Sequence, residues 1–146
     1  MVELSIKTDR VDDMDRELGV AEALVAEGSA PPLAPRDQPI DLAQLSRMTL
    51  GDRSLEQEVL ALFELQAGVL LARMASETPN VVAGLAHTMT GSARGVGAWK
   101  VAEAAEALER LSSGAGGPVM LNRAVDRLST AVSEAQAAIA EILRSR

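Results

Sequence analysis

Apolar residues recur at helical spacing along most of this chain, and short stretches rich in Gly, Pro and polar residues separate the periodic segments. A period of three to four residues is typical of amphipathic helices, whereas strands alternate every second residue. The clearest segment runs from Val119 to about Leu143 and carries a heptad seam: Leu121, Val125, Leu128, Val132, Ala135, Ile139 and Ile142. Such a seam predicts a coiled coil or one wall of an antiparallel bundle, and the other helices favour the bundle.

Two helices are predicted before residue 77. Asp41 is placed to cap a short helix that carries Leu42, Leu45 and Met48. After Gly51, either Asp52 or Ser54 can cap a longer helix that runs to about residue 76. Along this longer helix we expect one stripe: Leu55, Val59, Leu62, Phe63, Gln66, Val69, Leu70 and Met74.

Two more helices follow before the last one. Thr78 and Pro79 form a start signal, because threonine can cap a helix and proline is tolerated at its first position. This helix extends to about Val96, and the next spans residues 98–112 before the loop SGAGGP. The expected fold is therefore all-α, an antiparallel up-down four-helix bundle with a short additional N-terminal helix.

The chain divides by composition into an N-terminal extension, residues 1–39, and a helical domain, residues 40–146. Within the extension, residues 10–27 show apolar residues at helical spacing and could form an amphipathic helix. Residues 28–39 hold four of the six prolines and are predicted to be a linker. The sequence is compatible with an extension that packs on the domain, meets a partner or stays mobile.

Composition narrows the class of protein. With one Phe, one Trp and no Tyr, the core must come from aliphatic residues, which suits helices better than sheets. The formal charge of −7 argues against non-specific binding of nucleic acid. Cysteine is absent, which excludes disulfides and thiolate metal sites. Because the N-terminus lacks an apolar secretory segment and no apolar run could span a membrane, we expect a cytoplasmic protein.

Histidine occurs once, at His87, and its neighbours one helical turn away are small: Ala83, Gly84, Thr90 and Gly91. A glycine inside a helix costs about 1 kcal/mol relative to alanine, so the two glycines require an explanation. At about 100° per residue, the apolar residues of this helix, Val82, Leu85, Met89, Ala93 and Val96, lie on the side opposite His87. The imidazole is therefore predicted to face solvent from a patch that another protein could approach closely.

A single exposed imidazole limits the possible chemistry. Zinc requires three or four ligands, and no suitable partners recur at helical spacing. A catalytic triad is not indicated, since cysteine is absent and no serine lies in a strained nucleophile turn. Modification of the histidine itself fits better, because a solvated neutral imidazole is nucleophilic and can carry a phosphoryl group. The acidic row Glu103, Glu106 and Glu109 could suggest a metal or general-base site, but it is interpreted as a solvated helix face because no histidine or other acid is placed to complete such a site.

The segment AHTMTGSARGVGA, residues 86–98, resembles the signature of histidine phosphotransfer (HPt) domains of bacterial phosphorelays. Residues 45–63 are similar to the entry region of that family, and residues 101–111 to its following helix. The resemblance covers roughly residues 40–144. It implies a four-helix bundle whose His87 accepts a phosphoryl group from the aspartyl phosphate of a receiver domain and passes it to another receiver.

The resemblance also implies partners and a division of chemistry. The partners it implies are response-regulator receiver domains, a hybrid histidine kinase, or both. The acidic charge and the lack of a long apolar run predict no nucleic acid and no membrane as partners, and the chain is expected to be a monomer. It would be a phosphocarrier without catalytic machinery of its own and without an intrinsic cofactor, since the receiver supplies Mg²⁺. Positioning and charge neutralisation account for most of the catalysis in such a transfer.

One position departs from the family pattern. The third residue after the histidine is commonly lysine, and here it is Thr90, which offers a hydrogen bond but no positive charge. Arg94 lies on nearly the same face as His87, and we predict that it partly replaces the lysine; the other interpretation is a solvated arginine in weak ion pairs. Lys100, at the start of the next predicted helix, is a further candidate cation near the phosphate.

Three functions remain open from the sequence. The first is the phosphocarrier, with receivers docking on the second and third helices of the bundle. The second is a binding module that holds a receiver or kinase through the same patch without phosphate chemistry, which the Thr90 departure favours. The third is a helical scaffold that dimerises through the last helix or the N-terminal arm, which an apolar seam left exposed in the monomer would favour.

Overall fold

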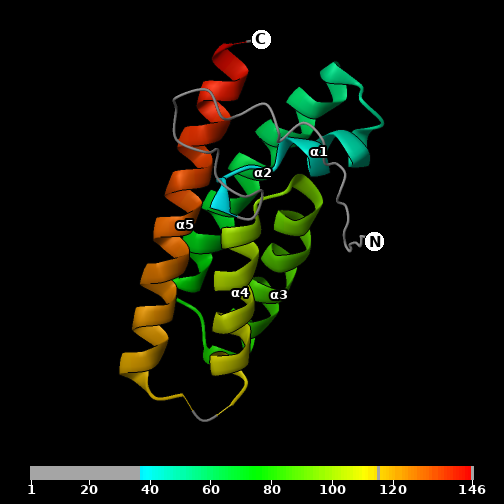
Figure 1. The fold of residues 1–146 in the computed structure, drawn as a ribbon. Helices are drawn as coiled ribbons and strands as arrows, with labels where there is room; N and C mark the ends of the chain where they lie inside the picture. Colours follow the sequence, from blue (N-terminus) through cyan, green and yellow to red (C-terminus); the bar gives the residue numbers. More distant parts are fainter. Residues whose placement is uncertain (1–36, 115, 146) are drawn as a thin grey trace, which may run out of the picture. The chain divides into compact units, whose positions relative to one another are not determined.

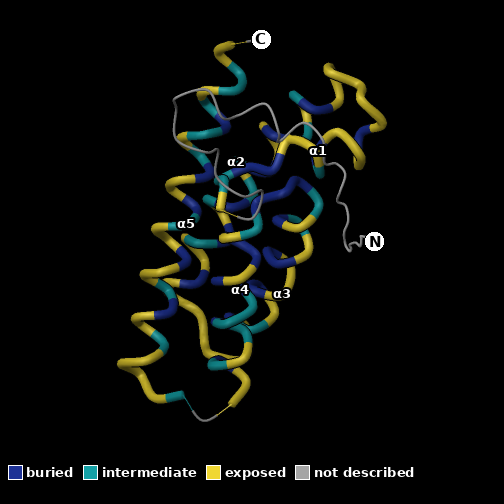
Figure 2. Tube along the Cα trace, in the orientation of Figure 1, coloured by how far each residue is buried: buried dark blue, intermediate teal, exposed yellow. Residues whose placement is uncertain are grey.

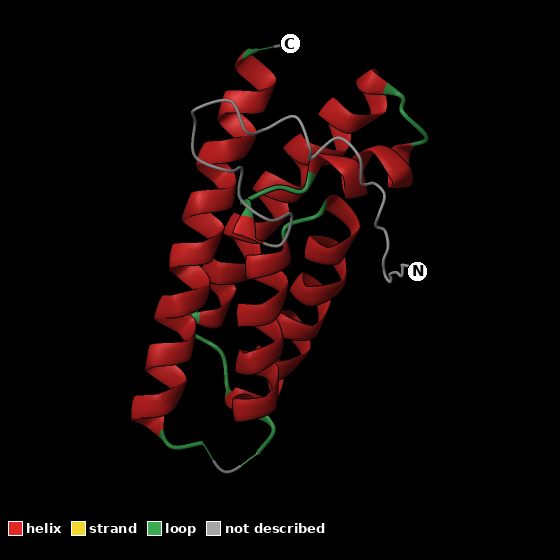
Figure 3. Cartoon of the chain, in the orientation of Figure 1, coloured by secondary structure: helices red, strands yellow, loops and turns green. Residues whose placement is uncertain are grey.

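The computed structural model describes residues 37–114 and 116–145, and all regular structure within them is helical (Figure 3). In chain order the helices are α1 (Leu42–Thr49), α2 (Arg53–Met74), α3 (Pro79–Val96), α4 (Trp99–Ser112) and α5 (Pro118–Arg144) (Figure 1). The all-α class is confirmed, and these bounds agree closely with those predicted. The helix predicted over residues 10–27, and all but the end of the predicted linker, lie outside the described residues, so the division of the chain at residue 39 stays a prediction.

The helices pack around one aliphatic core. α3 packs on α4 and on α2, α5 packs on α4 and on α2, and α1 covers one end of α2 and α3. Each helix turns its buried side inward, as the dark segments in Figure 2 show. The largest fully buried side chains are Leu45, Leu60, Met89, Leu108, Leu128, Ile139, Val101 and Val132.

The heptad seam of α5 faces this core. Leu128, Val132, Ala135 and Ile139 are buried, and the seam residues nearer the two ends are partly buried against the core: Leu121, Val125 and Ile142. The seam is therefore one wall of a helical bundle and is not free to form a coiled coil with another chain.

The stripe predicted for α2 is wrong in part. The line that packs into the core is Leu60, Phe63, Ala67, Leu70 and Met74. Three residues of the predicted stripe, Leu55, Leu62 and Val69, are exposed instead. α2 is apolar on more than one side, so its period alone could not decide which side is buried.

Asp41 ties α1 to the junction between α3 and α4. Its carboxylate accepts hydrogen bonds from the backbone of Ala43 and Gln44, which caps α1 as predicted, and from the Trp99 indole at 2.9 Å. Its own backbone N–H donates to the Gly97 carbonyl at 2.8 Å. Trp99 is thus partly buried and fixed by its N–H group. This junction determines where α1 lies relative to α3.

Candidate functional site

His87 projects outward from the middle of α3. The opposite side of the helix is buried at Val82, Leu85, Met89, Ala93 and Val96, as the sequence predicted. The His87 side chain is 76% exposed. An imidazole that contributes so little to packing is available to a partner that approaches α3 from outside.

A carboxylate from the neighbouring helix holds one side of the ring. Nδ1 of His87 lies 3.1 Å and 3.3 Å from the two carboxylate oxygens of Glu109 in α4. An ionised carboxylate can only accept a hydrogen bond, so Nδ1 must carry the proton. In the neutral ring Nε2 is then the nitrogen with the free electron pair.

Glu109 is a site residue that the sequence interpretation missed. The row Glu103, Glu106 and Glu109 remains at least partly exposed, but the expectation that no histidine is placed to meet it is wrong. Glu109 contacts His87, and Glu106 contacts Arg94 at 3.4 Å. The sequence did carry a signal. Because α3 and α4 form an antiparallel hairpin, residues equally far from its turn lie side by side, and His87 and Glu109 are equally far from Ala98.

Thr90 does not belong to the exposed patch. It is only 5% exposed, and its hydroxyl donates a 2.9 Å hydrogen bond to the Ala86 carbonyl. Helical geometry places it between the His87 face and the core face, and threonine readily bonds to the carbonyl four residues earlier. Its hydroxyl is therefore already engaged and does not face the exposed surface around the imidazole.

The glycines around His87 are not required by the fold. Gly84 and Gly91 are exposed, Gly95 is half-buried, and Ala83 beside them is also half-buried. A Cβ added at Gly84, Gly91 or Gly95 would meet no atom within 4 Å beyond the local helix. Each glycine costs about 1 kcal/mol in a helix interior. Packing within the described chain does not account for that cost, and the glycines leave the surface around His87 bare.

Of the two cations predicted near the phosphate, Arg94 lies on the same helix as His87, whereas Lys100 lies away from it. Arg94 is exposed on α3 and pairs with Glu106, which also lies 3.9 Å from Arg110. Lys100 lines a polar groove between α4 and α5 together with Asp126 and other residues. Since Lys100 is about two and a half turns of α4 from Glu109, the structure does not bring it to His87.

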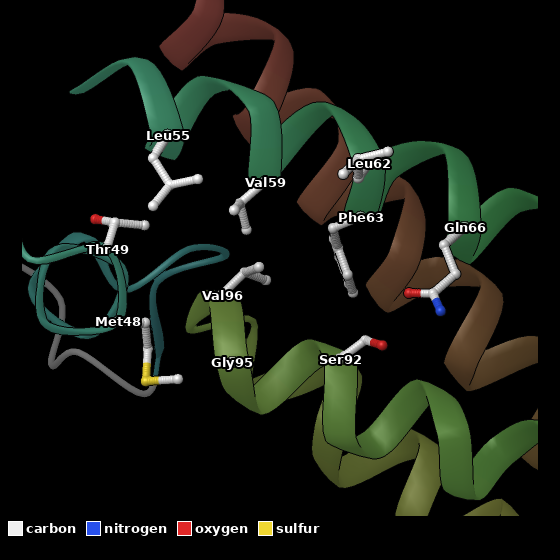
Figure 4. Close-up of a pocket in the computed structure, with 10 residues that line it drawn as sticks. All are labelled: Met48, Thr49, Leu55, Val59, Leu62, Phe63, Gln66, Ser92, Gly95 and Val96. Atoms are coloured by element: carbon white, nitrogen blue, oxygen red, sulfur yellow. The ribbon is translucent and has the colours of Figure 1, made fainter. Parts of the chain in front are cut away.

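An apolar groove opens next to the His87 surface, between α1, α2 and α3. Figure 4 shows its lining: Met48, Thr49, Leu55, Val59, Leu62, Phe63, Gln66, Ser92, Gly95 and Val96. Ser92 and Gly95 belong to α3 and follow Gly91, so the groove continues the bare surface of that helix. Gln66, which the sequence placed within an apolar stripe, lies half-buried on its wall. We call these lining residues the α1–α3 groove.

A metal site and a membrane span are both absent from the part of the chain that the structure describes. No group of three or more His, Asp or Glu side chains there is arranged to hold a metal ion. None of the described helices combines the length and the apolar character that a membrane span requires.

The described residues therefore form an all-helical bundle with an outward histidine that a carboxylate of the neighbouring helix contacts. The Hpt domain family matches residues 56–138, which is more than half of the chain. The chain therefore belongs to the Hpt domain family, whose members take part in histidine phosphotransfer signalling as phosphocarriers, with receiver domains and histidine kinases as partners. No curated protein and no solved structure gives a significant match.

Proposed function

We propose that His87 accepts a phosphoryl group from the aspartyl phosphate of one receiver domain and passes it to the aspartate of another. The Nε2 electron pair attacks phosphorus, the bond between phosphorus and the aspartate oxygen breaks, and the aspartate leaves as a carboxylate. The Nδ1 proton stays on the ring, where Glu109 stabilises the charge that develops. The second transfer reverses these steps on a new aspartate.

The observation that carries this proposal is the bare surface around an outward imidazole. In-line phosphoryl transfer requires the receiver pocket, with its Mg²⁺, to close over the ring. Gly84 and Gly91 leave room for that approach at a cost to the helix that the fold itself does not explain. We expect the helices to form an antiparallel four-helix bundle and the receiver to dock with its apolar side chains in the α1–α3 groove. This transfer would take place in the cytoplasm.

Transfer is tested with a phosphorylated receiver domain and Mg²⁺. The native chain should acquire a label that is labile in acid and stable in alkali, as expected for phosphohistidine. Receiver binding without any label would contradict the carrier and support the second candidate, a docking module. The observation that favours this second candidate is Thr90, which is buried and uncharged at the position where the resemblance leads one to expect lysine.

Glu109 orients the imidazole, and its loss should slow transfer. A hydrogen bond of this kind is worth about 1 kcal/mol, so we expect Glu109→Ala to lower the rate about fivefold without a comparable change in receiver affinity. Nitrogen-15 NMR of His87 should show the Nδ1-protonated tautomer in the native chain and a mixture of tautomers in Glu109→Ala. Glu106→Ala, one turn away on α4, is the matched control and should leave the tautomer unchanged. An unaltered tautomer in Glu109→Ala would refute the role.

Arg94 supplies the positive charge that Thr90 lacks. Its side chain can exchange Glu106 for the phosphoryl oxygens, because an exposed ion pair holds it by less than about 1 kcal/mol. Arg94→Gln should therefore shorten the lifetime of the phosphorylated state on transfer back to the receiver, by about threefold. The control is Arg123→Gln, an exposed arginine of α5. Equal rates in the two variants would mean that Arg94 is a solvated surface arginine.

A further inference from the structure

A row of large apolar side chains is exposed along α2. Leu55, Leu62, Leu65 and Val69 have exposed fractions of 41%, 65%, 67% and 51%. They lie about 140° around the helix from the buried line that includes Phe63 and Leu70. Figure 4 shows the first two of them at the wall of the α1–α3 groove. We call these four residues the α2 stripe.

The spacing of the α2 stripe is that of a coiled-coil seam. Its members are seven, three and four residues apart, and Ala72 continues the pattern three residues later. Beside Leu65 and Val69 a shallow groove separates α2 from α5, lined by Ala61, Glu64, Leu65, Gly68, Val69, Ala72 and Gln136. Small residues along such a groove allow the side chains of another helix to enter it. The α2 stripe therefore has the spacing and the adjacent groove that packing against another helix requires.

Charged residues near the two ends of the α2 stripe indicate that the partner helix is α2 of a second copy of the chain. Glu58 lies on the line of the stripe towards the N-terminal end of α2, and Arg73 lies on the same line towards the C-terminal end. Glu58 is exposed and makes no ion pair with any described residue, whereas Arg73 reaches Glu77 only at 4.0 Å. A parallel pair of α2 helices would bring like charges together. An antiparallel pair brings Glu58 of each copy to Arg73 of the other, in a two-fold interface.

We propose that two copies of this chain associate through antiparallel pairing of their α2 stripes. This departs from the monomer expected from the sequence. It places the exposed apolar seam that would favour self-association on α2, whereas the sequence had suggested the last helix or the N-terminal arm.

The association has a consequence that rests on the proposed function. Leu55 and Leu62 belong to the α2 stripe and also line the α1–α3 groove. A second copy on the stripe therefore covers part of the surface where a receiver docks. Self-association and receiver docking are mutually exclusive, and a high concentration of the chain restrains its own phosphotransfer.

The association is measured without any receiver, by sedimentation equilibrium of the full chain over a micromolar to millimolar range. The mass of the native chain should rise towards twice that of one copy, while Leu65→Glu should remain a monomer with unchanged helix content. Val119→Glu is the matched control, because Val119 is as exposed as Leu65 but lies at the start of α5. A native monomer at every concentration, or an equal loss of association in both variants, would overturn the proposal.

A charge swap tests the antiparallel arrangement. Glu58→Arg or Arg73→Glu alone should weaken association about tenfold, because each places like charges at both ends of the two-fold interface. The double variant should restore native association, which unspecific apolar contact would not do. Failure of the double variant to recover would refute the pairing. If His87 never carries phosphate, the masses measured for the association stay the same. Failure of the proposed phosphocarrier function can therefore be told apart from failure of the proposed association.

Discussion

The variant His87→Gln is expected to acquire no acid-labile phosphate from a phosphorylated receiver, while its fold and its affinity for the receiver stay close to native. Glutamine keeps a polar side chain of similar reach but has no ring nitrogen to attack phosphorus. The 76% exposed side chain of His87 contributes little to the core. What is lost inside the chain is one exposed hydrogen bond with Glu109, worth about 1 kcal/mol at most.

The measurement combines transfer, binding and stability on the same preparations. Lys100→Gln is the control, because Lys100 lines the groove between α4 and α5 and should carry label at the native rate. Label that persists in His87→Gln would show that another side chain is the acceptor. If the native chain binds receivers and never carries label, the protein is a docking module. If it does neither across a panel of receivers, membership of the family describes the fold alone.

The bounds of α3 followed from local signals, whereas the buried side of α2 did not. Pro79 occupies the first turn of α3 and Gly97 ends the helix in a left-handed conformation, whereas the Thr78 side chain at the N-cap position makes no capping hydrogen bond. α2 is apolar on more than one side, so several rotations satisfy its period equally well. Only packing against α3 and α5 selects Phe63 and Leu70 over Leu62 and Val69.

In the candidate site, too, some features follow from local sequence and others depend on packing between helices. The outward direction of His87 follows from the periodicity of one helix, and the structure agrees with it. Glu109 is distant in sequence and reaches the ring only because α3 and α4 form a hairpin, which a search within one helix cannot find. Thr90 sat at the boundary between two faces, where helical geometry is ambiguous and the carbonyl four residues earlier decides the outcome.

Gly97→Ala is expected to lower the free energy of unfolding by about 3 kcal/mol, the largest effect on stability that we predict from a single added methyl group. Gly97 has a φ of +79°, which costs an L-residue about 1–2 kcal/mol. A Cβ there would also lie 2.6 Å from the Asp41 carbonyl oxygen and 2.9 Å from the Asp41 Cβ. Neither atom can retreat easily, because the Asp41 N–H is bonded to the Gly97 carbonyl and its carboxylate to Trp99.

Gly84→Ala separates this local requirement from the general effect of adding a methyl group. Gly84 lies inside α3, and a Cβ there meets nothing within 4 Å, so alanine should raise the free energy of unfolding by about 0.5–1 kcal/mol. Urea unfolding followed by circular dichroism measures both changes, and the fluorescence of Trp99, the only tryptophan, reports whether the Asp41 junction has opened. Opposite signs are expected for the two variants. A Gly97→Ala chain as stable as the native one would mean that α1 can shift away from α3 freely, and then the α1–α3 groove would not be a preformed docking surface.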